Sequence, residues 1–192
     1  FDLKNLTLCL LLVSQICAEE LTIEIDGGAV EALPIAVVPF EIPDQFETNP
    51  AEIIKFDLSM SGKFRPLSES SMISTPTSFD AINFKDWRIL GVENLIIGRL
   101  MKNDNGHIIV FSLIDVFSET ELIKRKIAYG VNGFRRASHH ISDLIYHELV
   151  GKRGNFSTQI AYVVFKPSQT EYQLVVSDSD GHNPRTVFRS DQ

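Results

Sequence analysis

An unbroken apolar segment, Pro34–Phe40 (PIAVVPF), constrains the fold of this 192-residue chain more than any other feature of its sequence. A continuous apolar run of this length is typical of a strand that is buried on both faces of a sheet. A helix is predicted next, because Asn49 can cap it and Pro50 suits the first helical position. Glu52 would complete a capping box with Asn49.

The residues after this helix start predict further elements in quick succession. Ile53, Phe56 and Met60 recur at helical spacing, and Gly62 ends the helix. The Ser-, Thr- and Pro-rich residues 68–78 predict a surface loop. A short helix over 84–90 is expected, then strands over 93–101, 107–117 and 124–129, the first two joined by a hairpin turn at Asn105-Gly106.

The longest predicted helix covers residues 132–150 and ends at Gly151. Its apolar side chains fall on one face: they are Phe134, Ala137, Ile141, Leu144, Ile145 and Leu149. Strands interleaved with helices indicate an α/β fold with a mixed sheet and two to three helices. We assign this domain to residues 19–156.

The C-terminal residues follow a different pattern. Two strands are predicted, over 159–165 and 172–177, and the polar residues 178–184 follow them. Two strands alone are marginally stable in water. We therefore expect residues 157–192 to be the start of a β-repeat unit whose other strands lie beyond Gln192.

The N-terminal residues 1–18 predict a secretory signal peptide. Lys4 precedes a short apolar run, Leu6–Val13, and a small residue, Ala18, offers a cleavage site. The run is shorter than the ~20 residues needed to span a bilayer. Cleavage would remove both cysteines, Cys9 and Cys17, and with them any disulfide or thiolate site. A buried N-terminal helix or strand is the alternative, and lipidation of Cys17 is disfavoured by the residues before it.

The charge of the chain excludes some classes of partner. There are 18 Lys and Arg residues against 25 Asp and Glu, a formal net charge of −7. Nucleic acid binding favours a basic face that displaces counterions. An anionic membrane surface likewise attracts basic segments. Neither partner is expected here, and nor is membrane insertion once the signal has been removed.

The long helix also carries the histidines that could suggest a metal site. His140 and His147 share a face, but seven residues at ~1.5 Å each separate them by about 10 Å. Zinc–nitrogen bonds are only about 2 Å long. His139, His140, Asp143 and His147 lie opposite the apolar stripe, so we interpret them as a solvated polar face and expect no metal.

Two further motifs could be either ligand-binding loops or ordinary turns and helix ends. Asp178, Asp180 and Asn183 surround Gly181, but the order differs from an EF-hand and no downstream Glu follows, so a turn between strands is favoured. Gly151–Gly154 (GKRG) follows a helix instead of opening one, which favours a helix cap and linker over a phosphate loop. With no Gly-x-Ser-x-Gly elbow and no carboxylate dyad, we expect no catalytic residues and no cofactor.

Several motifs together resemble the TolB family, the periplasmic proteins of the Tol–Pal envelope system of Gram-negative bacteria. The clearest are Gly151–Val163 (GKRGNFSTQIAYV) and Ser177–Pro184 (SDSDGHNP). Others precede them in matching order: Pro34–Phe40, Asp57-Leu58, Ser61–Phe64, Pro66-Leu67, Trp87, Leu90-Gly91 and Glu93–Gly98. Each motif alone is weak, but the resemblance extends over the whole chain after residue 18.

The resemblance implies a fold and a function. It implies an N-terminal α/β domain followed by a six-bladed β-propeller, with residues from about Thr158 opening the first blade. Members of the family are non-enzymatic interaction proteins that connect TolA with the lipoprotein Pal. They keep the outer membrane intact and support its constriction during cell division. The Pal contact lies on the propeller, most of which is absent from this sequence.

The family's TolA contact maps to the segment from Glu19 to about Ala32. Two acidic residues, Glu19 and Glu20, open it. The next six alternate apolar and polar side chains in the period of a strand: they are Leu21, Thr22, Ile23, Glu24, Ile25 and Asp26. Such a strand can add to the edge of a partner's sheet. The alternative is a strand that stays docked in its own sheet.

Two functions of other classes remain open. One is a secreted propeller enzyme, such as a peptidase, whose catalytic part lies beyond Gln192. A Gly-x-Ser-x-Gly motif in the full gene would favour it, whereas more Asp-Gly-Asn turn repeats would favour TolB. The other is a periplasmic solute-binding protein, which a pocket with convergent polar groups would favour.

Overall fold

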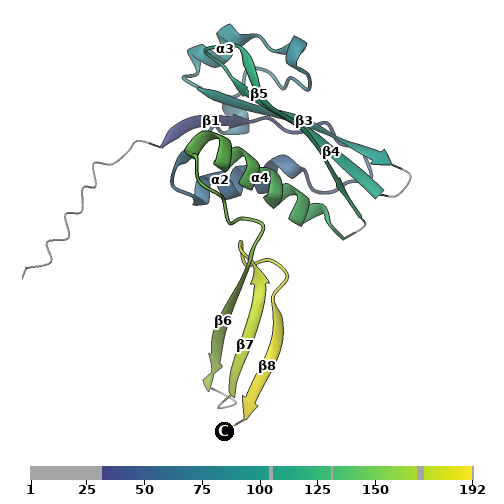
Figure 1. The fold of residues 1–192 in the computed structure, drawn as a ribbon, viewed down its shortest axis with the longest axis vertical. Coiled ribbons are helices and arrows are strands. Elements are labelled where there is room, and N and C mark those ends of the chain that lie inside the picture. Colours follow the sequence, from purple (N-terminus) through teal and green to yellow (C-terminus); the bar gives the residue numbers. More distant parts are fainter. Residues whose placement is uncertain (1–31, 104–105, 131, 168–170, 192) are drawn as a thin grey trace, which may run out of the picture. The chain divides into compact units, whose positions relative to one another are not determined.

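The computed structural model describes residues 32–103, 106–130, 132–167 and 171–191 (Figure 1). The chain divides into units at residues 1–30 and 31–192, and every described residue belongs to the second unit. Within the described residues, no helix is both long and apolar enough to cross a membrane. The predicted strand at Leu21–Asp26 and the predicted signal at 1–18 lie outside the described residues.

A five-stranded mixed sheet forms the centre of the α/β part. Its strands are β1 (Leu33–Val37), β2 (Phe64–Pro66), β3 (Asn94–Asn103), β4 (Gly106–Asp115) and β5 (Thr120–Tyr129). They lie in the order β2-β1-β3-β4-β5, with β1 parallel to both neighbours and β3, β4 and β5 antiparallel. The α/β fold class and mixed sheet are confirmed. The short strand β2 was not predicted.

The apolar run that predicted a buried strand is buried as expected. Ile35, Ala36, Val37 and Val38 are at most 2% exposed, and successive side chains enter different clusters. Ile35 and Val37 belong to the core on one face of the sheet, and Ala36 and Val38 to the core on the other. Because β1 has cores on both sides, it requires a covering layer on each face of the sheet.

Asn49 precedes the helix α2 (Pro50–Met60) and hydrogen-bonds to Phe40 at the end of this run. Its Oδ1 accepts hydrogen bonds from the Phe40 and Ala51 backbone N–H groups, each at 3.0 Å. Its Nδ2 donates to the Phe40 carbonyl at 2.8 Å. The predicted cap is confirmed, but Glu52 does not complete a capping box. Its carboxylate contacts Lys55 Nζ at 2.7 Å instead, one turn along the exposed side of the helix.

One face of α2 packs against the core and the other is exposed. Ala51, Ile54 and Leu58 face the core, whereas Phe56 is 48% and Met60 69% exposed. The predicted helix is confirmed, and of the three residues whose spacing indicated it only Ile53 is buried, at 5% exposed.

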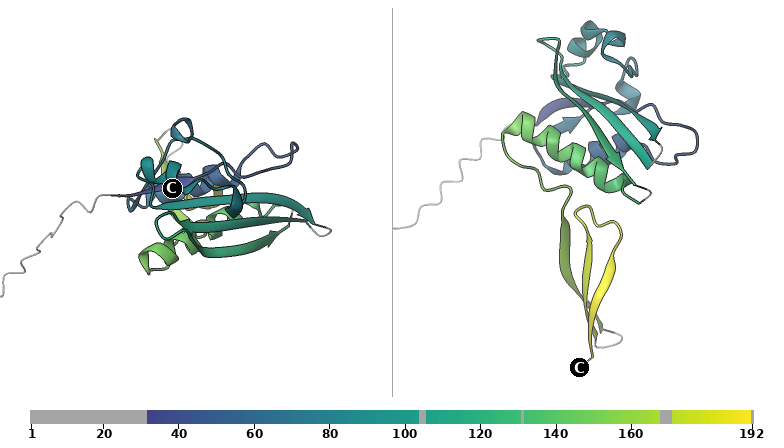
Figure 2. Two further views of the ribbon diagram at one scale, coloured as in Figure 1. Left: turned by 90° about the horizontal axis from the view of Figure 1, so that it is seen from above. Right: turned by 45° about the vertical axis from the view of Figure 1, so that its right-hand side comes forward.

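Helices cover both faces of the sheet (Figure 1). The helices α2 and α4 (Phe134–Val150) cover one face and share a core with β1, β3 and β4. The other face is covered by α3 (Phe84–Ile89), whose Trp87 is fully buried, and by the preceding loop with its 3₁₀ turns η1 (Glu69–Ser71) and η2 (Phe79–Ala81). In both views of Figure 2 the long helix α4 lies along the five-stranded sheet.

The helix α4 ends where its sequence predicts. Gly151 adopts a left-handed conformation with φ of 73° and its N–H donates to the His147 carbonyl at 2.9 Å. After it, β6 (Gln159–Lys166), β7 (Glu171–Asp178) and β8 (Arg185–Asp191) form a separate antiparallel sheet. Two of these strands were predicted. The third, β8, was not, because Arg185–Asp191 has little apolar alternation.

Candidate functional site

The residues predicted to contact a partner lie outside the described residues. They are Glu19, Glu20, Leu21, Thr22, Ile23, Glu24, Ile25 and Asp26. Their role therefore stays a prediction. Within the described residues, the most concentrated polar chemistry lies on α4, where the helix meets α2, the linker 151–158 and the turn between β7 and β8.

A buried cluster of charged side chains lies at the centre of this region. His139 Nδ1 is 2.8 Å from Asp57 Oδ2 on α2, and both side chains are at most 3% exposed. His139 Nε2 lies 3.5 Å from Asp180 Oδ2 in the β7–β8 turn. Arg135, one turn earlier on α4, also donates to Asp180 Oδ2. One histidine thus lies between two carboxylates that come from opposite ends of the sequence.

In this cluster the donor and acceptor of the hydrogen bond between His139 and Asp57 can be assigned. Because Asp57 Oδ2 is an acceptor, the imidazole places an N–H at Nδ1 to donate to it. Nε2 is buried and makes no hydrogen bond among the described residues. Buried carboxylates are stable only when they are paired, and here Asp57 is paired with His139 and Asp180 with Arg135. The pairs fasten α2, α4 and the turn to one another.

A second carboxylate on α4 holds the linker that follows the helix. Asp143 accepts hydrogen bonds from the Phe156 and Ser157 backbone N–H groups at 2.8 and 3.1 Å, and from Ser157 Oγ. Gly154 passes so close that a Cβ there would lie 2.4 Å from Asp143 Oδ1 and 2.9 Å from its Cα. A glycine is therefore required at this crossing for steric reasons.

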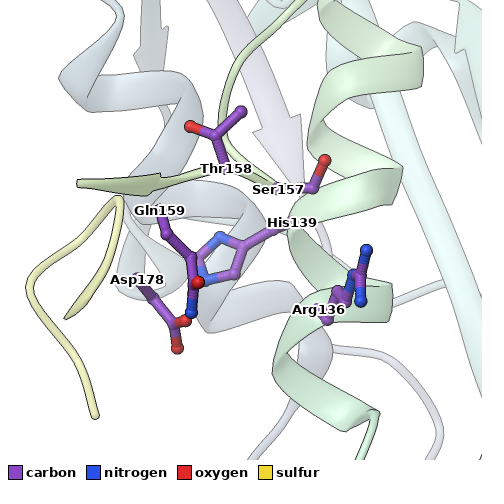
Figure 3. Close-up of a pocket in the computed structure, with 6 residues that line it drawn as sticks. All are labelled: Arg136, His139, Ser157, Thr158, Gln159 and Asp178. Carbon is purple, nitrogen blue, oxygen red and sulfur yellow. The ribbon is translucent and has the colours of Figure 1, made fainter. Parts of the chain in front are cut away.

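Between the cluster and the linker lies a small polar cavity of about 180 Å³. Figure 3 shows the six side chains that line it: Arg136, His139, Ser157, Thr158, Gln159 and Asp178. Most of its hydroxyl and carboxylate groups already have protein partners, with Thr158 Oγ1 donating to the Asn155 carbonyl and Asp178 accepting from Asn183. The cavity is large enough for a few waters, which would satisfy His139 Nε2.

A larger hollow of about 610 Å³ lies beside the cluster and is lined by apolar and polar groups. Its apolar side chains come from α2, α4, the linker and β6: they are Phe56, Met60, Tyr146, Phe156 and Ile160. The two exposed apolar residues of α2, Phe56 and Met60, therefore form part of its wall.

Comparison with known proteins identifies the family. A family model described as the TolB amino-terminal domain matches residues 21–122, which is more than half of the chain. The chain belongs to the TolB family. This confirms the resemblance that the sequence motifs indicated.

Curated TolB relatives match along most of the chain. "Tol-Pal system protein TolB" of Nitrosococcus oceani is 42% identical over 177 residues, covering 88% of this chain and 40% of the relative. The protein of the same name from Marinomonas sp. is 39% identical over 194 residues, covering 98% and 45%. The chain thus spans less than half the length of the curated relatives it matches.

A solved TolB structure agrees with the fold. The crystal structure of TolB from Acinetobacter baumannii superposes with a TM-score of 0.73 at 30% sequence identity, covering 83% of this chain and 39% of that one. The agreement supports the mixed sheet and its helices as a TolB fold.

The prediction of a solvated polar face on α4 was wrong for His139 and for Asp143, which is half-buried and binds the linker. His140 and His147 are exposed, as a solvated face requires, but His139 is 2% exposed and part of the buried cluster. A signal that could have indicated this burial is the pair Ser138 and Ser142. These small residues lie four positions apart beside His139, and both are fully buried. Small side chains at that spacing allow another segment to approach the helix closely. No group of three or more His, Cys, Asp or Glu residues within the described ranges is arranged to hold a metal ion.

The predicted turn at 178–184 is present, but it does more than join strands. Gly181 and Asn183 adopt positive φ angles of 82° and 51°, which suits a tight turn. Asp180 is directed into the buried cluster, a role that its place in a polar turn did not indicate. Nothing in the one-dimensional pattern distinguishes Asp180 from Asp178, because the distinction depends on α4.

Proposed function

We propose that this chain acts in the periplasm as a non-enzymatic interaction protein of the Tol–Pal system. In this role it connects TolA with Pal, helps keep the outer membrane intact and supports constriction during cell division. The observation that carries the proposal is the TolB amino-terminal family match over residues 21–122. It is supported by curated relatives that bear the name "Tol-Pal system protein TolB". Because the chain spans less than half of those relatives, each partner is proposed separately.

TolA binding is proposed for residues 19–26. Apolar and polar side chains alternate over residues 21–26, and four carboxylates in the segment add negative charge. This pattern suits a strand that adds to the edge of a partner's sheet, where backbone hydrogen bonds supply affinity and alternate side chains supply specificity. In this proposal the segment leaves its own domain to pair with TolA.

The test compares the chain starting at Glu19 with one that lacks residues 19–32, by calorimetric titration against the periplasmic part of TolA. We expect binding to be lost with the segment. A matched control keeps the segment but replaces Leu21, Ile23 and Ile25 with Ser, which removes the apolar face and keeps the charges. Unchanged affinity after the deletion would contradict the proposal.

Pal binding is proposed for a β-propeller, of which residues 157–192 would be the opening strands. The chain should then bind Pal weakly or not at all, while the full-length protein binds it. The same titration with Pal checks this. Tight binding of Pal by the 192-residue chain would overturn the assignment of that contact to the rest of the propeller.

Export to the periplasm is proposed through residues 1–18 as a cleaved signal. The support is the short apolar run after Lys4 and the small residue Ala18. Fractionation of cells that produce the chain, followed by N-terminal sequencing of the periplasmic product, tests it. We expect a new terminus at Glu19, and a cytoplasmic product that keeps residues 1–18 would refute it.

A further inference from the structure

The two edges of the five-stranded sheet are built differently. At one edge, β2 has three residues and ends in Pro66, which has no N–H to offer another strand. At the other edge, β5 has ten residues and pairs only with β4 among the described strands. From Ile123 to Tyr129 its pairing with β4 has no register shift. On its outer side this stretch therefore presents backbone groups that pair with no other described strand. The Lys124 carbonyl accepts a hydrogen bond from Arg125 Nη1 at 3.4 Å.

Positive charge is concentrated along this open edge. Lys124, Arg125 and Lys126 are consecutive and exposed, so the cations point to both faces of the strand. Across the sheet, Lys126 on β5 pairs with Val110 on β4, and Val110 pairs with the exposed Arg99 on β3. The chain as a whole carries a net charge of −7, so a cationic edge departs from the rest of its surface.

Only part of this charge is neutralised within the protein. Lys124 Nζ lies 3.3 Å from the Glu121 carboxylate. Lys126 and Arg99 make no ion pair with any described residue. Glu121 is in turn fixed by Ser112 Oγ, which donates to it at 2.7 Å. The negative charge is thus confined to the start of β5, and the middle of the strand remains cationic.

The sheet beside this edge also has uncovered apolar surface. The core under α3 ends at Ile97 and Ile114. Beyond it, on the same face, Met101 is 42% exposed, and its cross-strand neighbour Ile108 and the nearby Val110 are half-buried. A strand added at β5 would carry side chains that reach this surface and the cations together.

The edge is held in position by the turn before it. Asp115 accepts hydrogen bonds from the backbone N–H groups of Ser118 and Phe117 at 2.7 and 2.9 Å. The Ser118 N–H is the main reason why the pKa of Asp115 lies below its ordinary value. A turn fixed in this way starts β5 in one register, so little ordering is needed when another strand is added.

We propose that the outer edge of β5, residues Ile123–Tyr129, is a docking site for an extended acidic segment of a partner protein, which adds to the sheet as a further strand. Backbone pairing supplies affinity, and Lys124, Lys126 and Arg99 select Asp or Glu side chains. A second copy of this chain is disfavoured at the same edge, because it would bring lysines opposite lysines. The site comprises other residues than the segment 19–26 proposed to bind TolA, so a negative result for one proposal does not contradict the other.

The test uses a peptide of ten residues, the length of β5, in which Glu alternates with Val. A matched peptide carries Lys in place of Glu. Both are titrated into the 192-residue chain with amide NMR shifts as the readout, and amide hydrogen exchange is then measured with and without the acidic peptide. Lys124→Glu with Lys126→Glu reverses the edge charge. The control, Lys85→Glu with Lys152→Glu, replaces two exposed lysines outside β5 and changes the net charge of the chain by the same amount.

We expect only the acidic peptide to bind, with new protection of amides in Ile123–Tyr129. The β5 double variant should weaken binding about tenfold or more, and the control variant much less. The double variant Lys124→Gln with Lys126→Gln, which removes the charge without reversing it, should bind the acidic peptide with an affinity between those of the other two variants. Absence of binding, equal effects of the two charge reversals, or binding without protection of β5 amides would overturn the proposal. Binding of anionic lipid vesicles at the same edge in place of the peptide would also overturn it.

Discussion

The two sheets of this chain differ in how they bury their apolar side chains. In the five-stranded sheet, Leu95, Ile96, Ile109 and Leu113 are completely buried between helices. In the three-stranded sheet eight large apolar side chains are 36% to 63% exposed, Val164 and Val176 are half-buried, and only Val175, at 7%, is buried among the described residues. The exposed ones are Ile160, Tyr162, Val163, Phe165, Tyr172, Leu174, Val187 and Phe188.

The difference lies in what covers the strands among the described residues. The first sheet has a core on each face and is stabilised mainly by burial. The second sheet relies more on its strand pairing and on its attachments to α4, through Asp180 and through the linker that Asp143 holds. The following predictions test this contrast, from the largest expected effect to the smallest.

The largest contrast should come from the same substitution in each sheet. Phe111 in β4 is 1% exposed, and Phe165 in β6 is 47% exposed. We expect Phe111→Ala to lower the free energy of unfolding by about 3–5 kcal/mol, because it removes a buried ring and leaves a cavity. Phe165→Ala should cost about 1 kcal/mol or less, mostly from the lost ring contact with Tyr172. Urea unfolding measures both, and similar costs would mean that the second sheet has a core of its own.

The next effect concerns the attachment of the β7–β8 turn. Asp180→Ala removes the partner of Arg135 and should destabilise the chain by about 1–3 kcal/mol, because it leaves a partly buried cation without a partner. Asp178→Ala is the matched control, since among the described side chains that carboxylate accepts a hydrogen bond from Asn183 alone. Hydrogen exchange should rise in β7 and β8 for Asp180→Ala more than for the control. Equal exchange in the two variants would show that the cluster does not support the second sheet.

An effect of similar size is expected at the linker. Gly154→Ala places a Cβ against the α4 backbone at Asp143 and should cost about 1–3 kcal/mol, because the linker must shift. Gly130→Ala is the control: nothing lies within 4 Å of a Cβ there, so its stability should be unchanged or raised by ~0.4–1 kcal/mol. Thermal unfolding of the two variants distinguishes them. If Gly154→Ala is neutral, the linker is not held tightly by Asp143.

The smallest effect concerns Tyr129, whose buried hydroxyl has no hydrogen-bond partner among the described residues. Burial raises its pKa from 10.0 to about 12. The unfolded chain therefore loses this proton first, so stability should fall as pH rises from 10 to about 12. Tyr129→Phe should change stability by less than ~0.5 kcal/mol at neutral pH and reduce the alkaline decline. Tyr162→Phe, an exposed control in the second sheet, should leave the decline in place.

Much of the fold was predictable because the relevant signals are local. The cap at Asn49, the helix end at Gly151 and the hairpin strands on either side of Asn105-Gly106 depend on residues a few positions apart. The buried strand at Pro34–Phe40 could be identified from its composition alone. Strand β8 was missed because its sequence, Arg185–Asp191, is mostly polar, and it is assigned only by its hydrogen bonds to β7.

The candidate site was less predictable because its residues are far apart in the sequence. Asp57, His139 and Asp180 come from α2, α4 and the β7–β8 turn, and no local pattern connects them. The helix periodicity placed His139 on the polar side of α4 correctly. It could not indicate that this side is covered by the linker and the turn.

The sequence by itself determined the helices, most strands, the α/β class and membership of the TolB family, because each depends on local pattern or on the order of motifs. The tertiary structure alone decided which face of α2 is buried, that His139 is covered, that Asp180 is paired, and that β5 is an open cationic edge. The reason is physical. Burial, ion pairing and edge position depend on what packs against a residue. A neighbour that is distant in the sequence does not change the local spacing of apolar residues, so that spacing cannot reveal it.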